Sequence, residues 1–289
     1  MKLPLFIARR YFLARSSSNA VNIITGISVL GIFVGTAALI VVLSAFNGLE
    51  NLVRDFYRSF DPDLKIEQRE GRFFHPDSLD PRLLQDQRVA SYSWALEEKA
   101  LFYYRDHQYI ATAKGVDQHF PAVTAITEHL ESGNYLLADS LPVVPAVLGA
   151  GVAYRLGFSA QHYDENIRLF VPGAQPQGID VSTAYQERSI RPVGIFSIQP
   201  EFDEKYVLLP LSFTRSIYDR PGQVTQLEIR LHDYRQAEAF QEDWRQRLGD
   251  TFVLRNREEQ QAAFFKVMKT EGLFTFHIFA LILAIATFT

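Results

Sequence analysis

The stretch that decides the fold is AVNIITGISVLGIFVGTAALIVVLSAFNGL, residues 20–49. These thirty consecutive residues include no Asp, Glu, Lys, Arg or His. A helix rising about 1.5 Å per residue would extend about 45 Å over this stretch, more than the ~30 Å hydrocarbon core of a bilayer. The stretch therefore predicts a transmembrane helix, and its surplus length predicts a continuation outward to about residue 56.

A second apolar stretch, LFTFHIFALILAIATFT, occupies residues 273–289 at the end of the chain. Its 17 residues span about 25 Å as a helix, somewhat less than a bilayer core. No basic residue follows it to mark an inner boundary. We interpret residues 273–289 as an incomplete second transmembrane helix and the chain as a fragment of a longer membrane protein.

The charges flanking the first stretch predict its orientation. Residues 1–19 contain Lys2, Arg9, Arg10 and Arg15 and no acidic residue, and basic flanks stay on the cytoplasmic side. Residues 1–19 therefore form a cytoplasmic segment, with a helix expected along the inner membrane surface. A cleaved signal peptide is the competing interpretation, but its apolar core would be only about 7–15 residues long.

Residues 50–272 are then expected to lie outside, as a periplasmic domain. They carry 25 basic residues, the 29 of the chain less four in the tail, against all 33 acidic ones, a net charge of −8. Such a domain lacks the basic footprint of a nucleic-acid-binding protein. The chain has no cysteine, so its stability depends on core burial and not on disulfides.

Short strands and helices alternate in this domain and predict an α+β fold. A helix is expected to begin at Pro81, another to follow Gly149, and a third to span Tyr234–Leu248. The third is predicted to bury Ala237, Phe240, Trp244 and Leu248, which are spaced by three and four residues. The expected strands are 100–105 and 108–114 as a hairpin, then 143–148, 167–171, 193–198, 206–209 and 225–231.

The sequence supports no catalytic, cofactor or metal site. Gly149-Ala150-Gly151 imitates a dinucleotide motif, but Tyr154 occupies the third glycine position, so a tight strand-to-helix turn is expected. There is no P-loop, and the seven histidines have no metal-ligand spacing. The acid pairs 97–98 and 258–259 are expected on solvated faces. The chain is therefore expected not to be an enzyme.

Three features near the predicted spans are candidates for interaction. Gly31 and Gly35 form a small-xxx-small face for helix packing, although glycine is common in transmembrane helices anyway. His277 near the outer end of the second span is a functional candidate, the alternative being an interfacial imidazole. The connection Pro172–Ser189 is unusually long, which is typical either of a docking arm or of a floppy loop.

Three segments around the first span carry a family resemblance. They read FIARRYF at 6–12, NIITGIS at 22–28 and VLSAFNG at 42–48. They closely resemble the lipoprotein-releasing permeases of the LolC/LolE type, in the MacB-like class of ABC transporter permeases. The resemblance covers the whole chain. It implies a truncated permease with an N-terminal transmembrane helix, a large mixed α+β periplasmic domain and the start of a second transmembrane helix.

The resemblance implies a multi-pass subunit of the inner (plasma) membrane. A separate ABC ATPase dimer would drive it together with a second permease subunit, as a homodimer or heterodimer. The cargo would be lipoprotein, extracted from the outer leaflet of the inner membrane and passed to a periplasmic lipoprotein carrier. Two alternatives stay open, a mechanotransmitting permease that regulates a periplasmic cell-wall hydrolase and a MacB-like drug or peptide extruder.

The resemblance also implies two sets of site residues. By position, Phe46, Leu49 and Leu52 would line a cavity for membrane lipid and cargo acyl chains, and we place His277 with them. Apolar side chains favour acyl burial by about 0.8 kcal/mol per CH₂, although ordinary lipid-facing packing would use the same side chains. The connection 172–189 matches the carrier-recruiting arm of one permease type. Its predicted docking residues are Gln175, Pro176, Gln177, Gly178 and Ile179.

Overall fold

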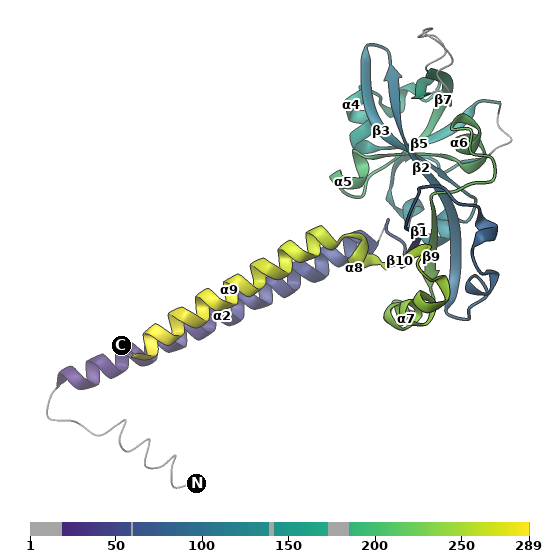
Figure 1. The fold of residues 1–289 in the computed structure, drawn as a ribbon. Helices are drawn as coiled ribbons and strands as arrows, with labels where there is room; N and C mark the ends of the chain where they lie inside the picture. The colour runs from purple at the N-terminus through teal and green to yellow at the C-terminus, as the bar shows by residue number, and fades with distance from the viewer. Residues whose placement is uncertain (1–18, 59, 139–141, 173–184, 289) are drawn as a thin grey trace. The chain divides into compact units, whose positions relative to one another are not determined.

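The computed structural model describes residues 19–58, 60–138, 142–172 and 185–288. The chain divides into two compact units, which are described separately. One unit, Met1–Val53 with Ala263–Thr289, is helical where it is described, and the other, Arg54–Ala262, combines strands and helices (Figure 1).

The helical unit contains most of α2 (Asn19–Arg58) and α9 (Ala262–Phe288). In α2, Gly26–Leu49 is long and apolar enough to cross a membrane, and among the described residues it is the one segment that meets both conditions. Many of its apolar side chains are exposed, Phe33 by 69%, and others, such as Phe46, are half-buried. The apolar part of α9 is shorter, Thr270–Ile282, so the second crossing stays a prediction.

One mixed sheet forms the framework of the second unit. Across the described residues its order is β10-β1-β9-β2-β3-β8-β5-β7-β4, and β6 pairs with both β2 and β7. The strands are β1 (Leu64–Gln68), β2 (Val89–Tyr104), β3 (His107–Val116), β4 (Leu130–Gly133), β5 (Val144–Gly149), β6 (Ile167–Pro172), β7 (Tyr185–Phe196), β8 (Tyr206–Pro210), β9 (Gln226–Leu231) and β10 (Phe252–Asn256).

Short helices flank this sheet, and α7 is the longest of those described in the unit. The α-helices are α3 (Phe120–Val123), α4 (Ala150–Leu156), α5 (Pro200–Asp203), α6 (Leu211–Ile217), α7 (Ala237–Leu248) and α8 (Arg257–Gln260). The 3-10 turns are η1 (Pro76–Ser78), η2 (Pro81–Leu83), η3 (Ile126–His129), η4 (Ala160–His162) and η6 (Tyr234–Gln236).

The long strand β2 connects two hydrophobic cores. Its first half pairs with β9, and its second half pairs with β3 and β6. The core on the β9 side includes Ile66, Phe240 and Trp244. The core on the β3 side includes Phe102 and Leu148. Burial of these side chains supplies the stability that a cysteine-free chain cannot obtain from disulfides.

The predicted hairpin and the predicted amphipathic helix are both confirmed. Strands β2 and β3 pair as far as Tyr104 and His107, so that two residues form the turn, and the first of them, Arg105, has φ 51°. In α7 the four predicted core positions are buried, and the indole N–H of Trp244 donates to the Asp86 carboxylate at 2.9 Å. The buried positions are Ala237, Phe240, Trp244 and Leu248.

The strand predictions were incomplete. Strands β1, β4 and β10 were not predicted, because their sequences are only four or five residues long and each carries polar or charged residues. Strand β7 begins at Tyr185, earlier than expected, and pairs with β6 from Ile167–Ile190 to Pro172–Tyr185. The long connection is therefore shorter than Pro172–Ser189, and residues 173–184 lie outside the described part of the chain.

The predicted tight strand-to-helix turn is confirmed, and Gly149 and Gly151 at this turn also allow close packing. Strand β5 ends at Gly149 and α4 begins at the next residue. A Cβ at Gly149 would lie 2.2 Å from the carbonyl oxygen of Asp203, and one at Gly151 would lie 2.8 Å from the backbone nitrogen of Glu204. These glycines let the α5 segment approach the start of α4.

We expect Gly149→Ala to destabilise the mixed domain by about 1–3 kcal/mol, because a backbone oxygen blocks the added methyl group. Gly272→Ala is the matched control, since a Cβ there meets no atom within 4 Å. Thermal unfolding of the purified chain in detergent measures the difference. Equal melting temperatures for the two variants would contradict the packing role.

Candidate functional site where the chain enters and leaves the mixed domain

The chain enters and leaves the mixed domain through neighbouring strands. Strand β1 follows α2, and β10 precedes α8 and α9. The two strands pair antiparallel from Leu64–Asn256 to Gln68–Phe252. Antiparallel pairing places the end of the incoming segment beside the start of the outgoing one.

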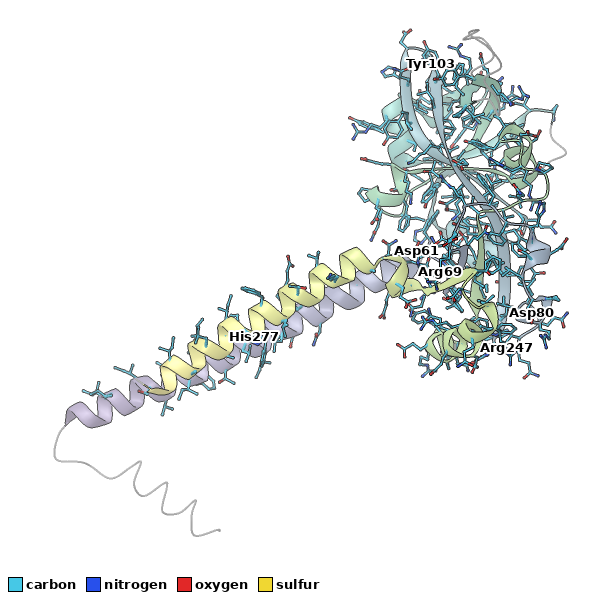
Figure 2. All side chains as sticks on the ribbon, in the orientation of Figure 1. Asp61, Arg69, Asp80, Tyr103, Arg247 and His277 are labelled. Carbon is cyan, nitrogen blue, oxygen red and sulfur yellow. The ribbon has the colours of Figure 1, made fainter. Side chains whose placement is uncertain are left out.

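Side-chain hydrogen bonds join the segments that flank these strands. The amide of Gln261 donates to the Asp61 carboxylate at 2.9 Å. The amide of Gln260 donates to the carbonyl oxygen of Pro62 at 3.2 Å. In Figure 2 Tyr103 lies at one end of the mixed domain and Asp80 and Arg247 at the other, with Asp61 between them.

A buried ion pair reinforces this junction. The Arg257 guanidinium donates to the carboxylate of Asp63, and the backbone N–H of Leu231 donates to the same carboxylate at 2.7 Å. The Asp63 and Arg257 side chains are 2% and 10% exposed. The Arg257 guanidinium also lies over the Tyr234 ring, 4.5 Å from its centroid. Because both charges are buried, removing either leaves the other without the opposite charge of this pair.

A second buried cation, Lys114, lies behind the incoming segment. Its ammonium is 2.6 Å from a Glu228 oxygen and 3.2 Å from a Glu97 oxygen. These three residues lie on the neighbouring strands β3, β9 and β2. Burial lowers the pKa of Lys114, but the two carboxylates outweigh burial and hold that pKa above its ordinary value.

Aromatic rings surround the Lys114 ammonium and fix the start of the incoming segment. The rings of Phe60, Phe120 and Tyr206 lie 4.9, 5.0 and 5.3 Å from it. Phe60 comes two residues after the end of α2 and is 1% exposed. Its ring also lies 4.6 Å from that of Phe202. The chain is therefore anchored in a ring cluster immediately after α2.

Asp61 beside this cluster is unusually hard to ionise. Burial raises the pKa of Asp61 to about 6, against an ordinary value of 3.8, although the hydrogen bond from Gln261 and the charges of Lys65 and Lys114 act in the opposite direction. Because the folded pKa is raised, the cost of ionising Asp61 is absent below about pH 4. The cost grows as the pH rises from about 4 to about 6 and stays constant at higher pH.

We expect Asp61→Asn to stabilise the domain at pH 8 by about 2–3 kcal/mol, since the amide keeps an acceptor for Gln261 and carries no buried charge. At pH 4 the variant and the unchanged protein should have the same melting temperature. Thermal unfolding at both pH values tests this, with Asp77→Asn on the exposed η1 turn as the control. The same stabilisation at both pH values would contradict it.

The junction joins two segments that are far apart in the sequence. No group of metal-ligating side chains is found in the described residues. The buried Asp63–Arg257 pair and the Phe60 ring cluster attach the segments that enter and leave the mixed domain to the adjacent strands β1 and β10. These contacts join the segment before β1 to the segment after β10.

The predicted cavity residues lie on the two long helices. Leu49 and Leu52 are 52% and 51% exposed, and Phe46 is half-buried. His277 on α9 is exposed, and its Nδ1 is 2.7 Å from the carbonyl oxygen of Leu273. A Cβ at Gly31 would meet no atom within 4 Å. These placements neither assemble nor exclude a cavity, so the cavity stays a prediction.

The remaining predicted residues are placed only in part. Gly35 is half-buried on α2. The docking residues 175–179 lie outside the described part of the chain, in the sequence between β6 and β7. On β6 the Arg168 guanidinium lies over the Tyr103 ring, 4.3 Å from its centroid.

Sequence reasoning missed the buried charges, and one expectation about them was wrong. Glu97 was expected on a solvated face, but its side chain is 16% exposed and pairs with Lys114. Glu259 is exposed, as expected, and its side chain also caps the start of α8 with Asn256 and accepts from Gln241 at 2.6 Å. The signal available for this cap was the N-x-x-E pattern at 256–259, which is typical of a capping box.

Comparisons with known proteins find a MacB-like family and relatives from lipoprotein-releasing systems. The family model described as MacB-like periplasmic core domain matches residues 25–247. The Haemophilus influenzae lipoprotein-releasing system transmembrane protein LolE is 26% identical over 81% of this chain and 56% of its own length. The Xylella fastidiosa (strain Temecula1) LolC protein is 23% identical over 99% of this chain and 68% of its own.

Solved structures give a weaker likeness. The periplasmic region of MacB from Actinobacillus actinomycetemcomitans matches with a TM-score of 0.46 at 13% identity, over 70% of this chain and 91% of that one. By the same comparisons, the chain spans about half the length of the Haemophilus influenzae LolE protein.

Proposed function

Because the chain belongs to the MacB-like periplasmic core domain family, we propose that it is part of an ABC transporter permease that releases lipoproteins from the inner membrane. A partner ATPase dimer supplies the energy, and a second permease subunit completes the membrane assembly. The permease extracts lipoprotein from the outer leaflet and passes it to a periplasmic carrier. The chain itself has a mechanical role and no catalytic one.

One observation carries this proposal. The expected resemblance to the LolC/LolE type is confirmed by LolE and LolC relatives, and the LolC match extends over 99% of this chain. That match includes α2, the mixed domain and α9. The proposed orientation places residues 1–19 in the cytoplasm and residues 50–272 in the periplasm.

The junction supports a coupling role within this proposal. Both proposed membrane segments leave the mixed domain from the paired strands β1 and β10. A stroke delivered to either helix would reach the domain through the Asp63–Arg257 pair and the Phe60 ring cluster. The mechanotransmitting alternative would use the same contacts, so cargo capture has to separate the two.

Photocrosslinking at Phe46 tests the cargo. In the complete permease–ATPase complex, a photoreactive side chain at Phe46 should capture triacylated protein, because the proposed cavity accepts acyl chains. The same probe at Tyr154, an 83% exposed residue of the mixed domain, is the control. No lipoprotein captured at Phe46 while the complex hydrolyses ATP would contradict the proposal.

Deleting residues 175–180 tests the proposed carrier arm. We expect the deletion to weaken binding of the periplasmic carrier at least tenfold, with lipoprotein capture at Phe46 retained. The matched control replaces the same six residues with Gly and Ser, which keeps the length and removes the side chains. Pull-down of the carrier on the purified complex gives the measurement. Unchanged carrier binding after the deletion would remove the docking role of 175–179.

A further inference from the structure

Strand β10, at one edge of the sheet, borders a groove. On one side β10 pairs with β1, and no other strand of the described residues pairs with it. The groove has a volume of about 390 Å³, within the range of small-ligand sites. Its walls come from β10, from the second half of α7, and from the side chains of Arg69 and Glu259.

The backbone groups of β10 point alternately toward β1 and toward the open edge. In an antiparallel pair the N–H and C=O of one residue point to the same side, and those of the next residue point to the opposite side. The N–H of Arg69 donates to the carbonyl oxygen of Thr251 at 2.8 Å, so the odd-numbered residues of β10 bond to β1. The backbone groups of Phe252 and Leu254 therefore face away from β1.

Three of these outward groups are free. The carbonyl oxygen of Leu254 accepts from the Gln241 amide at 2.9 Å, and the N–H of Asn256 donates to the Glu259 carboxylate at 3.2 Å. These two contacts agree with the outward direction and close one end of the edge. The N–H and C=O of Phe252 and the N–H of Leu254 have no hydrogen-bond partner among the described residues. Free backbone groups on a strand edge are a template for a further strand.

Arginines make this groove positive, although the domain as a whole is acidic. Arg69, Arg245 and Arg255 line it, together with one acid, Glu259. Two of the arginines have only loose partners, because Arg69 lies 3.9 Å from Asp250 and Arg245 lies 3.6 Å from Glu259. Exposed ion pairs of this kind are weak, so the carboxylates of a ligand can replace these partners.

The two faces of the edge differ in character. Arg69 lies opposite Thr251, so its side chain is on the same face of the sheet as that of Arg255. The opposite face of β10 belongs to the core that also contains Leu248 of α7. A strand added here meets arginines on one face and apolar side chains on the other, which suits a segment in which acidic and apolar residues alternate.

The charge also decides against a second copy of this chain as the occupant. Two β10 edges pairing with each other would bring arginines against arginines. Charged side chains are a usual protection of edge strands against such self-pairing. Charge of one sign leaves the edge open to a segment of the opposite sign.

We propose that the β10 edge binds an extended acidic segment of a partner protein, which adds a strand to the sheet. The backbone of that segment pairs with Phe252 and Leu254. Its acidic side chains lie on the face of Arg69 and Arg255, and its apolar side chains lie on the face of Leu248. The site does not depend on the lipoprotein-release proposal, because it uses neither the spans nor the arm.

Fluorescence anisotropy on the full chain in detergent tests the site with labelled peptides. The acidic probe is acetyl-Glu-Val-Glu-Val-Glu-amide, and the neutral probe has glutamine in place of each glutamate. We expect the acidic probe to bind at least tenfold more tightly than the neutral one. Equal binding of the two would overturn the proposal. So would displacement of the acidic probe by inorganic phosphate as readily as by the unlabelled peptide, since that result indicates an anion site only.

Methylated probes test whether the peptide adds as a strand. One carries N-methyl groups on both valines and the other on all three glutamates, because the nitrogens that face β10 belong to the valines in an antiparallel strand and to the glutamates in a parallel one. At least one methylated probe should bind at least tenfold more weakly than the acidic probe. Full binding of both would overturn strand addition.

Two variants locate the binding. Arg69→Glu should weaken the acidic probe at least tenfold, and Arg255→Ala should weaken it three- to tenfold, both without lowering the melting temperature. Arg235→Ala, at an exposed arginine paired with Asp233, is the control and should change nothing. If Arg69→Glu fails to fold, Arg255→Ala decides. Unchanged affinity in Arg255→Ala would overturn the site.

Discussion

Lys114→Met is expected to destabilise the mixed domain by about 3–5 kcal/mol, because it leaves the buried carboxylate of Glu228 without its cation. The Glu228 and Lys114 side chains are 1% and 3% exposed, so water cannot replace the lost partner. The methionine fills a similar volume, and a cavity therefore contributes little to the change. Thermal unfolding of the purified chain measures the effect.

A second variant separates charge from packing at this site. Lys114→Met combined with Glu228→Leu removes both charges and should recover at least half of the lost stability, since an apolar replacement of a buried pair is often neutral. Lys99→Met on the same hairpin is the surface control, because Lys99 is exposed. If the double variant were less stable than Lys114→Met alone, the charge explanation would fail.

Arg257→Ala is expected to cost about 3–5 kcal/mol and to loosen the pairing of β1 with β10, because the buried Asp63 carboxylate then loses its paired cation and keeps the Leu231 N–H. Hydrogen–deuterium exchange should show faster exchange of the backbone amides in both strands. Within the proposed function, such loosening would reduce lipoprotein release more than ATP hydrolysis.

The matched control lies on the same two strands. Arg255 on β10 pairs with Glu67 on β1 at 2.6 Å, but the side chains are 44% and 28% exposed. An exposed pair contributes only about 0–1 kcal/mol, so Arg255→Ala should leave exchange nearly unchanged. Equal exchange rates in the two variants would show that burial of the Asp63–Arg257 pair does not hold the junction.

Elements with a strong local pattern could be predicted from the sequence. The spacing of Phe240, Trp244 and Leu248 fixes one face of α7, and the alternation on both sides of Asp106 predicts the β2–β3 hairpin. Strands β1 and β10 could not be predicted in this way. Each strand has five residues, of which two are charged in β1 and one is charged in β10. Pairing with neighbouring strands stabilises both of them.

The buried charges of the candidate site could likewise not be predicted from the sequence. Lys114 and Glu228 are 114 residues apart, and neither has a neighbour in sequence that marks it as buried. Glu97 and Glu98 look alike in sequence, yet Glu97 pairs with buried Lys114 while Glu98 pairs with the exposed Arg72. Successive residues of a strand point to opposite faces, and only the sheet decides which face is covered.

By itself the sequence determined the apolar stretch 20–49, the acidic mixed domain, the face of α7 and the family resemblance, because composition and short periodicities are local properties. Only the tertiary structure decided that the chain enters and leaves the domain through paired strands. It also decided that Asp63 meets Arg257, 194 residues away. Such contacts depend on which strands become neighbours in the sheet, and hydrogen bonding and burial across the whole domain determine that order.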